Sequence, residues 1–350
     1  MENLSFIAEE LTTWYNAYQR DLPWRNTRDP YHIWISEIIL QQTRVTQGLD
    51  YYNRFIDRFP TILSLAEADE QEVLRYWQGL GYYSRARNLH GTAQRLQREF
   101  NGIFPKDYQI ILSLKGIGEY TAAAIASFAF NQPYPTVDGN VFRVLSRLFV
   151  IDIPIDTSKG KKYFTRLAAQ LIDPKAPALF NQALMEFGAL QCVPGIPDCK
   201  ICPFQNKCLA YANKQISGLP FKQHSTRTKD VYLYYFHIQH KDKFYLKKRQ
   251  GKGIWQNLYE FPSVESNHQL GFEEMIQTQA FQSIFPSSDY LDFRVMLQNR
   301  KHILSHRILY ATFYKVYIDE KNDFLNRYEL ISVEELDRYP LHRLMEMYFE

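Results

Sequence analysis

The four cysteines of this 350-residue chain all lie in one short stretch. They are Cys192, Cys199, Cys202 and Cys208, spaced C-x6-C-x2-C-x5-C. A secreted disulfide protein would spread its cysteines along the chain, whereas clustered thiols in a reducing compartment usually hold a metal. Four thiolates suit zinc as well as iron. The stretch therefore predicts a metal centre, with unliganded core cysteines as the less favoured alternative.

A second candidate for chemistry is Asp138, in the segment Val137-Asp138-Gly139-Asn140-Val141. About twenty residues earlier, Leu114-Lys115-Gly116-Ile117-Gly118 precedes a helical pattern. Two glycines separated by one residue allow a tight turn whose amides, at the start of a helix, can bind a phosphate oxygen. Taken alone, the glycines could form an ordinary turn between helices, and the aspartate could be an N-cap.

A third candidate is Glu37, the acidic residue in the apolar run Ile33-Trp34-Ile35-Ser36-Glu37-Ile38-Ile39-Leu40. Burial in such surroundings disfavours the charged form of a carboxyl group, so the group can act as a general acid near neutral pH. The alternative is a solvent-facing glutamate on an amphipathic helix.

Two kinds of structure must position these residues. Up to about Pro220 the pattern is helical, and we expect an all-α domain with helices over 33–42, 72–79, 86–100, 118–130, 140–149 and 180–191. We interpret the polar stretch 213–230 as a linker. After it we expect an α+β domain, with paired strands at 231–240 and 243–248, a strand at 308–318, and helices near 271–285 and 333–349. The predicted domains are thus 1–212 and 231–350.

Composition narrows the possible partners. The formal net charge is +3, so the protein as a whole is not strongly basic, and any surface that binds nucleic acid must be a local basic patch. No apolar run is long enough to span a bilayer, and the first ten residues lack a signal-peptide core. We expect a cytoplasmic monomer with no membrane association.

The glycine turn, the V-D-G-N-V segment and the cysteine stretch follow one another as in the helix-hairpin-helix glycosylases, and the resemblance runs from Leu22 to Cys208. The cysteine spacing resembles the iron-sulfur loop of endonuclease III and MutY glycosylases, so a 4Fe-4S cluster is favoured over zinc. Its role would be structural, folding a loop with Lys200 and Lys207 against DNA. By this resemblance Asp138 is the essential carboxylate, which faces the sugar C1′ or bonds to it transiently.

The runs Leu22-Pro23-Trp24-Arg25, Gln41-Gln42-Thr43-Arg44-Val45 and Gly79-Leu80-Gly81-Tyr82-Tyr83-Ser84-Arg85 look like the adenine-excising MutY branch. The resemblance implies that Glu37 protonates adenine N7. It also implies a pocket for the extruded base. That pocket would be lined by Trp24, Arg25, Leu40 and Gln182. Contacts to DNA would come from Gln42, Tyr82, Gly116, Gly118 and Asn140, with Gln42 and Tyr82 wedged into the duplex.

Tyr120 occupies the position at which strand-cleaving members of the superfamily carry a Schiff-base lysine. A phenol cannot form a Schiff base. The resemblance therefore implies a monofunctional glycosylase, with Tyr120 close to Asp138. Lys115 could give slow adventitious trapping.

The second domain resembles the Nudix-like C-terminal domain of MutY proteins. The run from Gly253 to Pro262 is similar to the opening of a Nudix box, but the acidic R-E-x-x-E-E helix that binds magnesium is absent, which argues against hydrolase activity. The family's Phe-Ser-His turn, which inspects 8-oxoguanine, corresponds to Leu304-Ser305-His306. Ser305 can hydrogen-bond at the N7–H and O8 edge of the lesion.

The sequence thus predicts a base-excision-repair glycosylase that removes adenine opposite 8-oxoguanine or guanine in double-stranded DNA. The alternatives are an endonuclease III-like or thymine-mismatch glycosylase, a non-catalytic zinc protein that binds DNA, and a Nudix hydrolase. Tyr120 and the second domain count against an endonuclease III-like enzyme. The pairing of Glu37 with Asp138 counts against the non-catalytic protein, and the missing acidic helix against the hydrolase.

Overall fold

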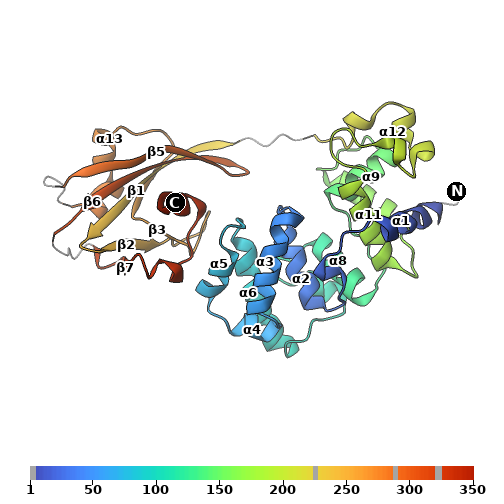
Figure 1. Cartoon of the computed structure of the whole chain (residues 1–350), viewed down its shortest axis with the longest axis horizontal. Coiled ribbons are helices and arrows are strands. Elements are labelled where there is room, and N and C mark those ends of the chain that lie inside the picture. The colour runs from blue at the N-terminus through green and yellow to red at the C-terminus, as the bar shows by residue number, and fades with distance from the viewer. Residues whose placement is uncertain (1–4, 224–227, 287–290, 320–324) are drawn as a thin grey trace. The chain divides into compact units, whose positions relative to one another are not determined.

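The structure is a computed structural model that describes residues 5–223, 228–286, 291–319 and 325–350. Contacts between Cα atoms divide the chain into two compact units, each described here by itself (Figure 1). Unit 1 comprises Met1–Glu67 and Gly91–His224, and unit 2 comprises Ala68–His90 and Ser225–Glu350.

This division differs from the contiguous domains predicted at 1–212 and 231–350. Residues Ala68–His90 lie in unit 2, because their side chains hydrogen-bond to segments that follow the linker. The first part of the predicted linker lies in unit 1, where the Phe221 carbonyl accepts a bond from the Ile155 amide at 3.0 Å. Residues 224–227 of that linker are outside the described residues.

The described part of unit 1 is helical and contains no strand. The helices predicted near 33–42, 118–130, 140–149 and 180–191 are confirmed as α2, α8, α9 and α11, and the one near 86–100 as α6, which spans the boundary between the units. The bounds are α1 Ser5–Tyr18, α2 Pro30–Leu40, α3 Val45–Arg58, α4 Ile62–Glu67, α6 Ser84–Phe100, α7 Tyr108–Leu112, α8 Glu119–Phe130, α9 Gly139–Phe149, α10 Ser158–Leu171, α11 Pro177–Leu190 and α12 Leu209–Ala212.

Local chemistry sets where the important helices begin. Asp29 caps α2 by accepting a bond from the Tyr31 amide at 2.8 Å, and Pro30 occupies the first turn, where no amide hydrogen is needed. Nearly all of α2 is buried, as expected for a helix that is apolar on every side. Helix α2 packs against α8, and α11 packs against α1, α8 and α9 (Figure 1).

One glycine allows a close approach that the site requires. A Cβ at Gly188 of α11 would lie 2.9 Å from the backbone oxygen of Asn140, at the start of α9. Any side chain at this position would therefore push the start of α9, which follows Asp138, away from α11.

Unit 2 contains a mixed sheet, and its strands confirm the predicted hairpin at 231–248. The bounds are β1 Lys229–His240, β2 Lys243–Lys248, β3 Tyr259–Glu260, β4 Ser263–Ser266, β5 Phe293–Ile303, β6 Arg307–Tyr317 and β7 Glu329–Ser332. The main strand order is β3-β2-β1-β6-β5, with β4 paired to β1 and β7 paired to β2. Strands β1 and β6 run parallel, and the other pairs are antiparallel.

The helices of unit 2 are shorter than the sequence predicts. The predicted helix at 271–285 is divided into α13 (Phe272–Ile276) and α14 (Gln279–Ile284), because the Thr278 hydroxyl accepts from the Phe281 amide and starts a new helix. Of 333–349, only Arg343–Phe349 forms an α-helix, α15, after Pro340 interrupts the segment. Helix α5 (Glu70–Trp77), capped by Asp69, also belongs to this unit.

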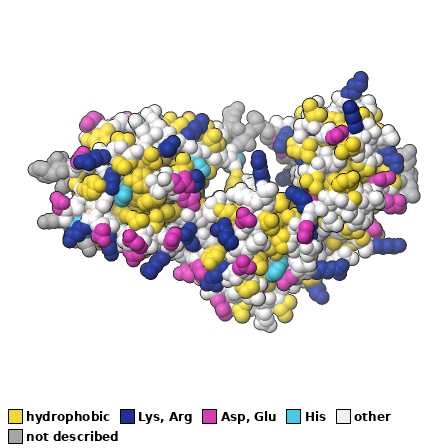
Figure 2. Space-filling view, in the orientation of Figure 1, with side chains coloured by type: hydrophobic (Ala, Val, Ile, Leu, Met, Phe, Trp, Pro, Cys, Tyr) yellow, Lys and Arg dark blue, Asp and Glu magenta, His cyan; other side chains and the backbone are white. Residues whose placement is uncertain are grey.

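Surface charge agrees with the small net charge of +3. On the face shown in Figure 2, Lys and Arg side chains are spread over both units without forming one continuous positive surface. No helix among the described residues is long and apolar enough to cross a membrane.

Candidate active site

A cavity of about 880 Å³ in unit 1 brings together most of the predicted site residues of the helical domain. They come from the turn before α2, from α2 itself and the loop after it, and from α8, α9 and α11. The predicted residues that line the cavity are Trp24, Arg25, Glu37, Leu40, Gln42, Tyr120, Asp138, Asn140 and Gln182. Residues distant in sequence therefore converge on one space large enough for a nucleobase.

Glu37 is buried, with 7% of its surface exposed, although it lines the cavity. Burial raises the pKa of Glu37 to about 7, and the charge of Asp138 contributes to the rise, while a hydrogen bond from Tyr120 opposes it. A carboxyl group with this pKa holds its proton through much of the neutral range. Glu37 can therefore donate a proton to a group bound in the cavity.

Asp138 caps α9 and has both carboxylate oxygens engaged. Its Oδ1 accepts from the amides of Asn140 and Val141 at 2.9 and 2.8 Å, and its Oδ2 accepts from the Asn140 side-chain amide at 2.7 Å. Burial raises the pKa of Asp138 above its usual value, and these hydrogen bonds oppose the rise. Asp138 is therefore an N-cap, one of the two predicted alternatives, and the capping bonds hold its carboxylate at the cavity wall.

Tyr120 lies on α8 near both acids. Burial raises its pKa well above the ordinary value, and the charges of Glu37 and Asp138 add to the rise. Its hydroxyl also donates to the Met185 sulfur at 3.8 Å. Tyr120 is therefore a neutral hydrogen-bonding group between the two carboxyl-bearing walls of the cavity.

A hydrogen-bonded chain joins Asp138 to the cysteine stretch. Asn140 donates to Asp138 through its side-chain nitrogen and accepts from Arg143 through its side-chain oxygen, at 2.8 Å. Arg143 also donates to the carbonyls of Cys192 at 2.7 Å and Gly188 at 2.6 Å. The position of the catalytic candidate is therefore coupled to the fold of the first cysteine.

The sequence did not reveal an ion cluster that also lines the cavity. Glu186 accepts two bonds from the Arg20 guanidinium group, at 2.8 and 2.5 Å, and two from that of Arg25, at 2.9 and 2.6 Å. Burial alone would raise the pKa of Glu186, but the two guanidinium groups outweigh it and lower the pKa to about 2. Glu186 lies four residues after Gln182 on α11, so helical spacing would have placed it on the same face.

Neighbouring aromatic residues orient the predicted pocket. Tyr15 donates its hydroxyl to the Gln182 side-chain oxygen at 2.9 Å, which leaves the Gln182 nitrogen as the end that can donate to a ligand. Trp24 is buried and packs edge-on against Tyr52, with ring centroids 5.1 Å apart. The pocket thus combines an apolar wall with a directed amide.

The residues of unit 1 that are predicted to contact DNA fall into two groups, one that lines the cavity and one that does not. Gln42 is exposed at the cavity, in a left-handed conformation with φ of 59°. Gly116, also left-handed with φ of 82°, and Gly118, the residue before α8, are both exposed and lie outside the cavity lining. Buried Leu114 and Ile117 anchor this turn, so its glycine backbone faces outward.

The four cysteines line one small cavity together with Phe187 and Phe204. As placed, no group of three or more His, Cys, Asp or Glu side chains in the described part of the chain forms a metal-binding arrangement. The donor set itself suits a four-thiolate centre, and Arg147 donates to the Cys192 sulfur at 3.4 Å. Burial raises the pKa of Cys202 to about 12, so a bound cation would be needed to stabilise its thiolate.

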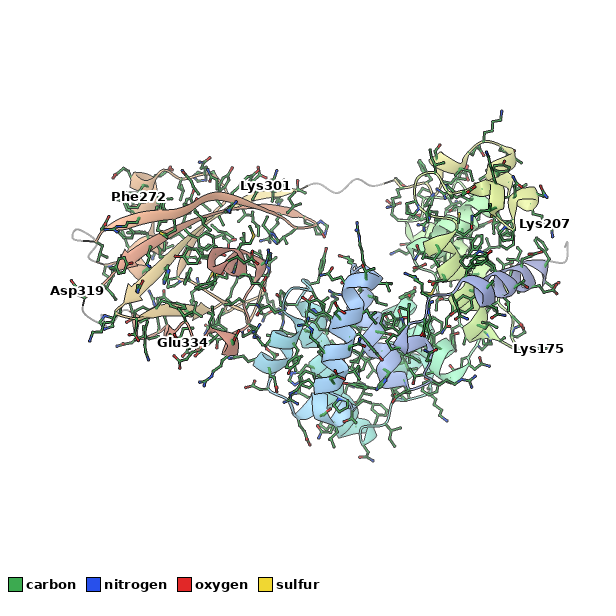
Figure 3. All side chains as sticks on the ribbon, in the orientation of Figure 1. Lys175, Lys207, Phe272, Lys301, Asp319 and Glu334 are labelled. Atoms are coloured by element: carbon green, nitrogen blue, oxygen red, sulfur yellow. The ribbon has the colours of Figure 1, made fainter. Side chains whose placement is uncertain are left out.

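Lys207 of the cysteine stretch, labelled in Figure 3, lies with its Nζ 3.7 Å from the centre of the Phe6 ring.

In unit 2, the turn between β5 and β6 is formed by Leu304, Ser305 and His306, and the Leu304 amide donates to the Arg307 carbonyl at 2.8 Å. Lys301, also labelled in Figure 3, lies on β5 before that turn. Ser305 and His306 are exposed, and Leu304 is half-buried.

Comparisons with known proteins agree with this geometry. The chain matches the HhH-GPD superfamily base excision DNA repair protein family over residues 35–174 and a NUDIX domain family over 234–350. An adenine DNA glycosylase of Buchnera aphidicola subsp. Baizongia pistaciae (strain Bp) is 37% identical over 330 residues, covering 92% of this chain and 89% of that protein. The adenine DNA glycosylase of Mus musculus is 43% identical over 230 residues, covering 62% of this chain and 45% of that protein.

Solved structures show the same helical fold. A thermostable thymine-DNA glycosylase matches with a TM-score of 0.56 and 30% identity over 60% of this chain and 97% of that chain. An endonuclease III in a non-covalent complex with DNA matches with a TM-score of 0.53 and 22% identity over 61% of this chain and 99% of that chain, which supports the fold alone. Given the identity to an adenine DNA glycosylase over nearly its whole length, the chain belongs to the adenine DNA glycosylase (MutY) family of base-excision-repair enzymes, which hydrolyse N-glycosyl bonds.

Proposed function

We propose that this enzyme removes adenine paired with 8-oxoguanine or guanine in double-stranded DNA, without cleaving the strand. The observation that carries the proposal is the shared cavity of Glu37, Tyr120 and Asp138, in which the pKa of Glu37 is raised to about 7. The names and length coverage of the relatives support adenine as the base. The substrate must be extruded from the duplex to reach this cavity.

Glu37 is the general acid. Its proton passes to adenine N7 as the bond between N9 and C1′ breaks, so the electron pair of that bond leaves with a neutral base. Arg25 and the Gln182 amide, held by Glu186 and Tyr15, orient the base. Water then adds to C1′ and gives its proton to the Glu37 carboxylate, which restores the acid.

Asp138 stabilises the positive charge that develops at C1′, or bonds to it transiently before water adds. Its fixed position is valuable because a preorganised charge requires no reorganisation when the transition state forms. Three hydrogen bonds hold the carboxylate while leaving it negative.

The absence of strand cleavage is supported by the cavity wall. Its lining contains Arg20, Arg25, Arg44 and Arg143 but no lysine among the described residues. A guanidinium stays protonated and does not form a Schiff base as a lysine amine does. Tyr120 stands where strand-cleaving relatives carry that lysine.

We also propose that Leu304, Ser305 and His306 read the base opposite adenine, with Tyr82 and Gln42 entering the duplex. Ser305 is exposed and can hydrogen-bond to the N7–H and O8 edge of 8-oxoguanine. Gly116, Gly118 and Asn140 contribute contacts to the DNA backbone. Leu304 offers apolar contact where the family carries an aromatic ring.

Cys192, Cys199, Cys202 and Cys208 would hold a 4Fe-4S cluster that stabilises the fold of this stretch and, through Arg143, the position of Asp138. Anaerobically purified protein is expected to be brown, with about four irons per chain. Cys199→Ser is expected to lower both the iron content and the melting temperature. A colourless protein that contains one zinc ion per chain would contradict the assignment.

The test of the proposed substrate uses four duplexes that differ in one base pair: adenine opposite 8-oxoguanine, adenine opposite guanine, thymine opposite guanine, and an oxidised pyrimidine opposite adenine. The free base is identified by mass spectrometry. We expect adenine from the first two duplexes and no base from the others. Release of thymine or of the oxidised pyrimidine as the main product would refute the proposal.

A further inference from the structure

Unit 2 holds helix α5 against the segments that follow β7, through hydrogen bonds between residues far apart in sequence. Arg75 donates to the Asp337 carbonyl at 2.7 Å and to its carboxylate at 2.8 Å. Gln71 donates to the Arg338 carbonyl at 2.8 Å. Helix α5 and the turn after it are therefore part of the same compact unit as the sheet.

The turn at residues 79–83 is here called the wedge turn because it carries Tyr82. Residues at its two ends are hydrogen-bonded to the backbone of one residue, Leu341. The Leu341 amide donates to the Gln78 side-chain oxygen at 3.0 Å, just before the turn. The Tyr83 hydroxyl donates to the Leu341 carbonyl at 3.2 Å and accepts from the Gly79 amide at 3.3 Å. Leu341 is thus bound by residues at both ends of the wedge turn.

Gln78 uses both ends of its side-chain amide in this attachment. Its oxygen accepts from Leu341 and from Arg75, the latter at 3.1 Å, and its nitrogen donates to the Glu346 carboxylate at 2.6 Å. A carboxylate accepts hydrogen bonds but cannot donate them, so the Glu346 carboxylate requires a donor at position 78, while the Leu341 amide requires an acceptor there. The side chain at position 78 is therefore chemically specified.

The wedge turn needs such support because its backbone is strained. Tyr82 has a left-handed φ of 46°, and it follows Gly79 and Gly81, which have φ of 94° and 71°. A non-glycine residue keeps this conformation only when its surroundings impose it. The result is a tyrosine ring that is 47% exposed on a fixed backbone.

The wedge turn also contacts the turn at residues 304–306, here called the reader turn. The hydroxyls of Tyr82 and Ser305 are hydrogen-bonded to each other. Both residues belong to unit 2, so the contact lies within one compact unit. The aromatic residue expected to enter the duplex and the hydroxyl expected to read the opposite base thus lie side by side.

We infer that Gln78 is a positioning residue for opposite-base recognition, which sets Tyr82 against the reader turn so that the two turns act as one recognition element of unit 2. This inference rests on the proposed roles of Tyr82 and Ser305. Gln78 is not among the described residues that line the cavity of Glu37 and Asp138. Its substitution should therefore change the choice of opposite base and leave the chemical step intact.

The experiment compares full-length wild type, Gln78→Glu, Glu346→Gln and the double variant Gln78→Glu/Glu346→Gln. Gln78→Glu places two carboxylates together and removes the donor, whereas the double variant restores one hydrogen bond with its direction reversed. Gln282→Glu, on the exposed face of α14, is the control for added negative charge. Single-turnover rates are measured for adenine opposite 8-oxoguanine and opposite guanine, with hydrogen exchange of the amides at 79–83 as a readout independent of activity.

Gln78→Glu is expected to lower the ratio of the rate opposite 8-oxoguanine to the rate opposite guanine about tenfold, as for loss of one well-formed hydrogen bond to a charged group. The rate opposite guanine should stay unchanged, and exchange at 79–83 should accelerate. The double variant should recover both properties, and Gln282→Glu should resemble wild type. An unchanged ratio, or equal loss on both substrates, in Gln78→Glu would overturn the inference. Wild type that shows no preference for 8-oxoguanine would instead refute the proposed role of the reader turn, while unchanged exchange in Gln78→Glu would refute the attachment itself.

Discussion

Asp138→Asn is expected to slow adenine excision at least about a thousandfold while the protein remains folded. Opposite charges about 4 Å apart interact by about 4 kcal/mol at an effective dielectric constant of about 20. Loss of that stabilisation at C1′ corresponds to about three orders of magnitude in rate. The measurement is single-turnover excision on a duplex with adenine opposite 8-oxoguanine.

The fold should survive because the asparagine oxygen can still accept the capping bonds from Asn140 and Val141. Its nitrogen would face the Asn140 side-chain nitrogen, and Asp138→Asn/Asn140→Asp restores that bond without restoring the charge at C1′. The double variant should therefore be as stable as wild type and remain inactive. Asp107→Asn, which alters the cap of α7 away from the cavity, should keep full activity. Wild-type rates in Asp138→Asn would contradict the assigned role.

Glu37→Gln is expected to lower the excision rate by about two to four orders of magnitude, the usual contribution of general acid catalysis. Because the acid must be protonated to act and its pKa is about 7, the wild-type rate should be constant below that pH. Above it the rate should fall about tenfold per pH unit, as the carboxylic acid is converted to carboxylate. The measurement is the pH profile of single-turnover excision.

The variant should lose this alkaline decline, since glutamine does not titrate. Glu37→Asp keeps a carboxylic acid but shortens the side chain by one methylene group. This variant should therefore excise adenine slowly while retaining a pH-dependent rate. A Glu37→Gln profile that matches wild type in height and shape would show that another group supplies the proton.

Sequence alone predicted the local features of this enzyme well. The apolar run around Glu37 forms a buried helix, because apolar residues on every side of a helix leave it no solvent-facing surface. Asp138 is an N-cap, as its position before Gly139 allows. The nine predicted residues that line one cavity were found through motifs whose order matched a known superfamily.

Long-range contacts could not be predicted in the same way. Arg20 and Glu186 are 166 positions apart, and neither belongs to a motif that carries chemistry by itself. The attachment of α5 to Asp337 was missed for the same reason, since helical periodicity shows which face is buried but not which element covers it. Strand β5 escaped prediction because most of its residues are exposed and show no alternation.

The most direct test of the account is single-turnover reaction of the wild-type enzyme with adenine opposite 8-oxoguanine, divided into samples analysed with and without alkali. Glu37, Asp138 and Tyr120 in a cavity whose described lining contains no lysine predict an intact abasic strand, which breaks only after alkali. Strand breakage without alkali, at the rate of adenine release, would show that an amine attacks C1′ and would contradict the proposed chemistry.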